Sequence, residues 1–286
     1  MIIEFKYSMV QDLMYHILAH MRVENDSNLY SEAYIDSINK IKNGKYDSIK
    51  ETMLHLSNYY NDNFERLAII NFMPLICSSV QELICAIENY YDFTNKDKKE
   101  FIFPLIQLIK SENKFYEEYW NKLYDTTLML RKDFELWAKN EMSKYEVLFT
   151  YFDKFAEVRM SYSLTNNGRG CKNDSSFNAV VPFPFKESNY KNVFYQILHE
   201  YTHQFTDEFV SENIRVDDGT HDIAEKVVIL FDYYLIKKLN KEDTDSYLKW
   251  IGKLANVDNC DETLFLSIFK IDDNIKKNLL ELLEKL

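Results

Sequence analysis

The residues best suited to chemistry lie in one stretch, where His199, Glu200 and His203 form an H-E-x-x-H pattern. On an α-helix the two histidines lie one turn apart on the same face. This spacing lets both imidazoles reach one Zn²⁺ at about 2.0–2.1 Å. Glu200 lies about 100° around the helix from His199, so it can act on a metal-bound water without binding the metal. The motif therefore predicts a zinc site with a general base beside it.

Two observations support this interpretation of the motif. The chain has six histidines in 286 residues, so the pattern would arise by chance only about 0.01 times. The surrounding residues also have helical periodicity, and we expect a helix from 189 to about 213. One broad apolar stripe runs along that helix, formed by Val193, Phe194, Ile197, Leu198, Tyr201, Phe205 and Phe209. The histidines lie nearly opposite the stripe, although a surface helix whose histidines meet only water would show the same pattern.

The motif resembles that of the zincin metallopeptidases, with weaker similarity from about 177 to 232. The resemblance implies a zinc-dependent hydrolase that acts on a peptide or protein substrate. The metzincin pattern needs a third ligand six residues after the second histidine, where this chain has Phe209, and it is ruled out. Gluzincins take a glutamate from the following helix instead, about twenty residues on. Glu225 follows His203 by 22 residues, so it is the expected third ligand.

The helix that carries Glu225 is expected to run from 221 to 239. His221, Glu225 and Asp232 fall within about 40° of one line on it. Glu225 could instead form a capping box with Asp222 at the start of this helix. Asp222 is also a rival ligand, because the four residues 219–222 resemble the Gly-Thr-x-Asp of aspzincins.

A catalytic zinc site needs groups beyond its ligands. The resemblance implies that Zn²⁺ on His199, His203 and Glu225 acidifies a water, whose proton Glu200 takes and passes to the leaving amine. Asp232 or Asp207 could orient a ligand imidazole. Several residues could stabilise the oxyanion, and the sequence does not choose among them: His221, Tyr233, Tyr234, Arg215 and Tyr162.

Substrate binding is expected on a strand at 176–182, which Pro182 and Pro184 confine to a sheet edge. Zincins add an extended substrate to such an edge. Asn178 and Ala179 resemble the Asn-Ala dipeptide that opens this strand in thermolysin-like enzymes, so they are the expected substrate-binding residues, although a plain edge strand would look the same.

The rest of the chain predicts a mainly α fold of the α+β class, with a small β-sheet. Residues 6–155 have helical patterns only, and Gly44 and Pro104 are suited to a helix end and a helix start. From 157 to 164 the residues alternate like a strand, and 165–170 has the composition of a loop. We therefore expect a helical region over 1–155 and a zincin-like catalytic region over 156–286.

Composition narrows the class of protein. The formal net charge is −12, and no element carries a basic patch, which argues against nucleic-acid binding. No signal peptide or membrane-spanning run is evident, so a cytoplasmic protein without membrane contact is expected. Cys77 and Cys85 are expected to be buried, whereas His16 and His20, also four apart, are expected on a helix surface.

Two other functions fit the same sequence. One is a helical binding or regulatory protein with a catalytically idle zinc site. The other is a helical interaction domain without metal. Metal analysis distinguishes the metal-free interaction domain from the two zinc-binding proteins. Turnover of peptides then distinguishes the enzyme from the protein with an idle zinc site.

Overall fold

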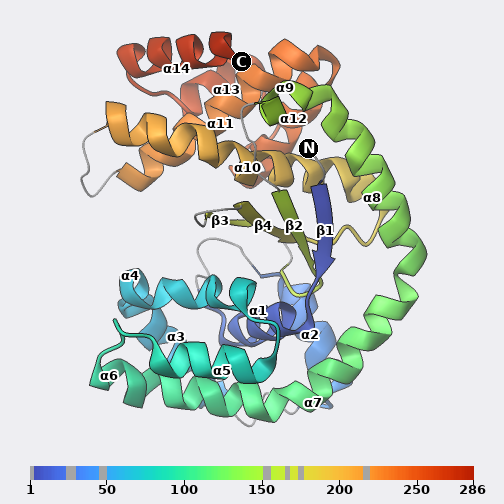
Figure 1. The fold of residues 1–286 in the computed structure, drawn as a ribbon, viewed down its shortest axis with the longest axis vertical. Coiled ribbons are helices and arrows are strands. Elements are labelled where there is room, and N and C mark those ends of the chain that lie inside the picture. The colour runs from blue at the N-terminus through green and yellow to red at the C-terminus, as the bar shows by residue number, and fades with distance from the viewer. Residues whose placement is uncertain are drawn as a thin grey trace.

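The structure is a computed structural model that describes residues 3–23, 30–44, 50–150, 156–164, 168–172, 177–214 and 220–286. It is mainly helical, with one four-stranded mixed sheet. Figure 1 shows the sheet between two groups of helices: α1–α6 on one side and α10–α14 on the other. The long helices α7 and α8 run along one flank and connect the two groups. The expected mainly α fold with a small sheet is confirmed.

The helices before the second strand have these bounds: α1 Met9–Met21, α2 Glu32–Ile41, α3 Lys50–Asp62, α4 Phe64–Leu67, η3 Ala68–Asn71, η4 Met73–Ile76, α5 Val80–Asn89, α6 Asn95–Asp97, η5 Lys98–Ile102, α7 Phe103–Thr126, α8 Leu128–Met142, η6 Ser143–Tyr145 and α9 Glu146–Thr150. The later ones are η7 Glu187–Asn189, α10 Tyr190–Asn213, α11 Thr220–Leu239, η8 Lys241–Asp243, α12 Thr244–Leu254, α13 Glu262–Ile268 and α14 Asp273–Lys285. Helices α10 and α11 match the expected ranges closely. Gly44 has a φ of 73° just beyond α2, and Pro104 lies in the first turn of α7, as expected.

The strands are β1 Ile3–Tyr7, β2 Ala156–Ser161, β3 Arg169–Lys172 and β4 Phe177–Pro182, in the spatial order β1-β2-β4-β3. β1 pairs in parallel with β2, with Ile3 opposite Ala156. The expectation of helices only from residue 6 is wrong at its start, because Lys6 and Tyr7 belong to β1. Apolar and charged residues alternate along Ile3–Tyr7, as on a half-buried strand. The sheet thus joins the first residues of the chain to the segment after 155.

The expected position of the last strand is wrong. β4 is an inner strand, paired in parallel with β2 and antiparallel with β3. Pro182 fits there because it is the last residue of β4, where a missing N–H interrupts little of the ladder. β3 takes the edge position instead and begins at Arg169, inside the stretch expected to be a loop. Asn178 and Ala179 therefore cannot pair with an added substrate strand.

The helical side of the sheet is held by polar contacts as well as by its apolar core. Asp12 of α1 is fully buried and accepts hydrogen bonds from Ser161, from the backbone N–H of Tyr162 and from Trp120 of α7. Burial raises the pKa of Asp12 to about 7, although these donors act in the opposite direction. The contacts tie the end of β2 to α1 and α7.

Three side chains differ from expectation in their burial: His16, His20 and Cys85. His16 and His20 are buried, at 0% and 6% exposed, because α7 packs over the face of α1 expected to meet water. Nδ1 of His16 lies 2.9 Å from the Tyr34 hydroxyl, and Nδ1 of His20 lies 2.8 Å from the carbonyl of His16. Cys85 is exposed rather than buried, whereas Cys77 is buried as expected.

Within the described residues, no helix is both long and apolar enough to cross a membrane.

Candidate metal centre

Helix α10 positions the two histidines of the motif. Its expected apolar stripe is buried, with Val193, Ile197 and Tyr201 each no more than 4% exposed. This side packs against β4 and β3, which explains why the helix is held firmly over the sheet. The side chains of His199 and His203 lie off that face and remain 16% and 20% exposed. The helix therefore presents both imidazoles away from the core, as its periodicity predicts.

Helix α11 packs against α10 and brings Glu225 to the histidines. Nε2 of His199 lies 3.5 Å from Oε2 of Glu225, and Nε2 of His203 lies 3.7 Å from Oε1. One ligand atom from each of the three residues lies within 4.8 Å of the other two. Ligands at about 2.1 Å from a tetrahedral zinc lie roughly 3.4 Å apart, so this set of two nitrogens and one oxygen fits the ion.

The other residues weighed as a third ligand do not join this set. Asp222 is exposed at the start of α11, one turn before Glu225. Among the residues that the structure describes, His199, His203 and Glu225 form the one group with metal-ligand spacing. The geometry thus favours Glu225 over Asp222.

Both histidines have a carboxylate behind the ring. Nδ1 of His199 lies 2.9 Å from Oδ2 of Asp232, which is fully buried and also accepts a hydrogen bond from Thr202. Nδ1 of His203 lies 3.4 Å from Oδ1 of Asp207. Because a carboxylate accepts, each Nδ1 acts as donor, and this tautomer leaves Nε2 free to bind a metal. Both residues expected to orient an imidazole are therefore in place, and Asp232 makes the shorter contact.

Replacing Asp232 by Asn should weaken zinc binding about 10- to 100-fold, because the ligand imidazole loses its charged partner. The matched control is Asp207→Asn, whose carboxylate is 61% exposed and makes a 3.4 Å contact. That variant should bind zinc nearly as tightly as the wild type. Competition with a chromophoric chelator measures both affinities, and thermal melting checks the fold. Equal losses in the two variants would contradict the assigned role of Asp232.

Carboxylates surround both histidines of the centre and raise their pKa values. Burial by itself lowers the pKa of His199, but hydrogen bonds to Asp232 and Glu225 outweigh it and hold the pKa well above its usual value. The pKa of His203 is also raised, because contacts with Asp207 and nearby carboxylates overcome burial. The nearby carboxylates thus stabilise positive charge on both imidazoles.

Glu200 stands beside the three candidate ligands and is 8% exposed. Burial raises its pKa above the ordinary value, while the positive charges of His199, His203 and Arg169 act against burial. Gly168, just before β3, lies against this carboxylate: a Cβ there would be 2.9 Å from Oε1 of Glu200 and 3.0 Å from the carbonyl of Val180. A side chain at position 168 would therefore force the Glu200 carboxylate or the Val180 carbonyl to shift.

Sequence reasoning missed Gly168 and Arg169, because both lie in the stretch expected to be a loop. The glycine-rich run 168–170 was the available signal, since glycine in or near a strand often marks a close approach of backbone to another group. Nη1 of Arg169 lies 3.5 Å from the carbonyl of Gly168, next to the contact with Glu200. Through Gly168, the start of β3 lies against the Glu200 carboxylate.

Two of the described residues considered for oxyanion binding, Tyr162 and Tyr233, make their contacts elsewhere in the fold. Tyr162 contacts Thr127, the residue between α7 and α8, through its hydroxyl, at 2.7 Å, and is buried. Tyr233 accepts a hydrogen bond from Lys237 and packs on Phe265. Both are therefore engaged with other parts of the fold. Tyr234 packs against Tyr233, and Arg215 and the His221 side chain lie outside the described parts of the structure.

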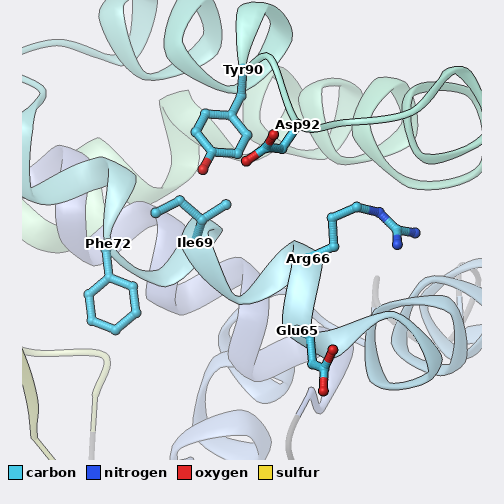
Figure 2. Close-up of a pocket in the computed structure, with 6 residues that line it drawn as sticks. All are labelled: Glu65, Arg66, Ile69, Phe72, Tyr90 and Asp92. Carbon is cyan, nitrogen blue, oxygen red and sulfur yellow. The ribbon is translucent and has the colours of Figure 1, made fainter. Parts of the chain in front are cut away.

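Two surface hollows lie away from this centre. One of about 420 Å³ is lined by residues of α4, η3 and the end of α5, among them Ile69, Tyr90 and Asp92. Figure 2 shows Tyr90 and Asp92 facing Ile69, while Phe72 and Glu65 point away. Another, of about 550 Å³, lies beside it around α5 and includes Ile76 and Tyr91. Neither contains a residue of α10, α11 or the sheet, so neither belongs to the metal centre.

Comparison of the chain with protein-family models, curated proteins and solved structures gave no match.

Proposed function

We propose that this protein is a zinc-dependent peptidase with a zincin-like catalytic region. The observation that carries the proposal is the meeting of His199, His203 and Glu225, with the carboxylate of Glu200 beside them. Two histidines and one glutamate leave a fourth coordination position open, which is the pattern of catalytic rather than structural zinc. When bound, the ion supplies a Lewis acid that lowers the pKa of a water and polarises a carbonyl.

The residues of the chain then have separate tasks. Glu200 accepts the proton of the attacking water and returns it to the leaving amine, as a positioned general base and acid. Gly168 keeps that carboxylate in place by leaving room for it. Asp232 holds the imidazole of His199 in the ligand tautomer, whereas the exposed Asp207 makes only a longer contact with His203.

The substrate is proposed to be a peptide or protein bound along β3. This strand has β4 on one side, and none of the described strands lies on the other. An extended peptide can add to such an edge through main-chain hydrogen bonds. Because Gly168 at the start of β3 contacts Glu200, a peptide on this edge would pass the general base.

Metal removal tests the function directly. Purified protein loaded with zinc should cleave members of a mixed peptide library, and mass spectrometry of the products detects the cleavage. Treatment with a chelator should abolish turnover, and added zinc should restore it. Protein that holds zinc but cleaves no peptide would instead support a binding or regulatory role with an idle metal site.

A further inference from the structure

Two surface hollows adjoin each other on the helical side of the molecule formed by α1–α6. Tyr90, the residue after α5, lines both of them. In the first hollow its ring faces Ile69 (Figure 2), and the second extends over α5 and includes Ile76 and Tyr91. We call the two hollows together the α5 groove, whose apolar side chains are Ile69, Phe72, Ile76, Ala86, Tyr90 and Tyr91.

Two apolar side chains of the α5 groove are far more exposed than the fold requires. Tyr91 is 85% exposed and Ile76 is 74% exposed, the two highest values among the large apolar side chains that the structure describes. Both line the same hollow. Exposed apolar side chains that gather in one hollow, with polar residues at its rim, are typical of a surface that another molecule covers.

The α5 groove also carries negative charge. Glu65 and Asp92 line the first hollow, and Glu82 lines the second. None of these three carboxylates has a salt-bridge partner in the part of the chain that the structure describes. Arg66 lines the first hollow as well, but its guanidinium donates hydrogen bonds of 2.7 and 2.8 Å to Asp97, which compensate its charge.

A molecule that fits the α5 groove must therefore combine apolar and cationic groups. Large apolar groups would cover Ile76 and Tyr91, and cations would lie near the carboxylates. The faces of Tyr90 and Tyr91, whose ring centroids lie 5.0 Å apart, attract a Lys or Arg side chain in addition. A peptide with apolar side chains between basic ones supplies both kinds of group, and opposite charges at a rim favour its association.

We propose that the α5 groove binds a peptide segment of a partner protein, in which large apolar side chains are flanked by Lys or Arg. The apolar side chains cover Ile76 and Tyr91, and the cationic ones face Glu82 and Asp92. The inference goes beyond the proposed peptidase function and does not rest on it, because the groove contains no residue of α10, α11 or the sheet.

A displayed library of random short peptides tests the proposal. Full-length protein carrying Glu200→Gln serves as bait, so that the proposed peptidase reaction does not destroy the library. Peptides that also bind the bait carrying Ile76→Ser and Tyr91→Ser are removed first, which discards ligands of the metal centre. We expect the recovered peptides to combine large apolar residues with Lys or Arg, and to be poor in Asp and Glu.

Fluorescence anisotropy then measures the affinity of the recovered peptides for the bait and its variants. Ile76→Ser/Tyr91→Ser should weaken binding at least about 10-fold, the scale of losing an apolar anchor at an interface. The matched control is Met129→Ser/Leu136→Ser, which removes two side chains of α8 that are 66% and 65% exposed and should leave binding unchanged. Thermal melting confirms that each variant folds.

The contribution of charge is measured with a second pair of variants. Glu82→Gln/Asp92→Asn should weaken binding about 3- to 10-fold at low salt, and high salt should remove the difference by screening. Gln at position 82 can still accept the hydrogen bond from the backbone N–H of Ser78. Glu117→Gln/Glu118→Gln, which neutralises two exposed carboxylates of α7, is the matched control and should bind like the bait.

The outcomes decide between this occupant and others. Recovery of no peptide that depends on Ile76 and Tyr91, or recovery of peptides without cationic residues, overturns the proposal. A dimer in sedimentation velocity that Ile76→Ser/Tyr91→Ser dissociates would assign the groove to a second copy of the chain and overturn it as well. Failure of the peptidase function would leave these results unchanged, because different residues carry the two sites.

Discussion

Replacing Glu200 by Gln should reduce peptide hydrolysis at least about 100-fold, the usual scale for loss of a positioned acid–base group. Gln keeps the shape and volume of the buried side chain, which lies against Gly168, but it cannot accept the proton of the attacking water. Zinc content and thermal stability should stay near wild type, because Glu200 is not among the three candidate ligands. Turnover of a cleaved library peptide, measured for both proteins at equal zinc loading, checks the result.

The matched control is Glu208→Gln, which makes the same change at an exposed position of the same helix. Its turnover should equal that of wild type. If wild type and Glu200→Gln cleave peptides equally fast, the general-base role is wrong. If both hold zinc and neither cleaves any member of a broad library, the idle-site function replaces the peptidase.

The parts of the site that lie on helices follow from local sequence. Apolar spacing alone predicts α10 and places His199 and His203 away from its buried stripe, and the structure confirms both. Glu225 and Asp232 lie on one face of the next helix, α11, and both contact His199 of α10. Their shared face also follows from local sequence, because their spacing matches the helical period. Helical periodicity repeats within four residues, so a short window of sequence contains the whole signal.

The sheet follows different rules. β1 and β2 are neighbours in space but lie about 150 residues apart in the chain. A local sequence pattern therefore cannot predict which strands pair. This is why β4 was expected at the edge that β3 occupies, and why Gly168 and Arg169 were not recognised beside Glu200. The burial of His16 has the same origin, because it depends on α7 packing over a helix far from it in sequence.

Replacing His203 by Ala should lower the zinc content from about one ion per chain to a residual amount. The reason is that a catalytic zinc needs three protein ligands besides water, and only two would remain. Elemental analysis of the purified protein measures it. His55→Ala is the matched control, since His55 is an exposed histidine on α3 with a 3.7 Å contact to Glu100. Unchanged zinc in His203→Ala would contradict the assignment of the centre.

Glu225 can be tested against its rival in the same assay. Glu225→Ala should weaken zinc binding more than Asp232→Asn does, for which we expect a loss of roughly 10- to 100-fold. The loss is larger because Glu225 would contribute a ligand atom itself, whereas Asp232 only orients a ligand imidazole. Asp222→Ala should leave zinc affinity unchanged, since its side chain is exposed and lies outside the cluster. The reverse order of effects would assign the third ligand to Asp222. It would also require α11 to turn by about a sixth of a revolution relative to α10, since residues three apart on a helix differ by about 60° and Glu225 now faces both histidines.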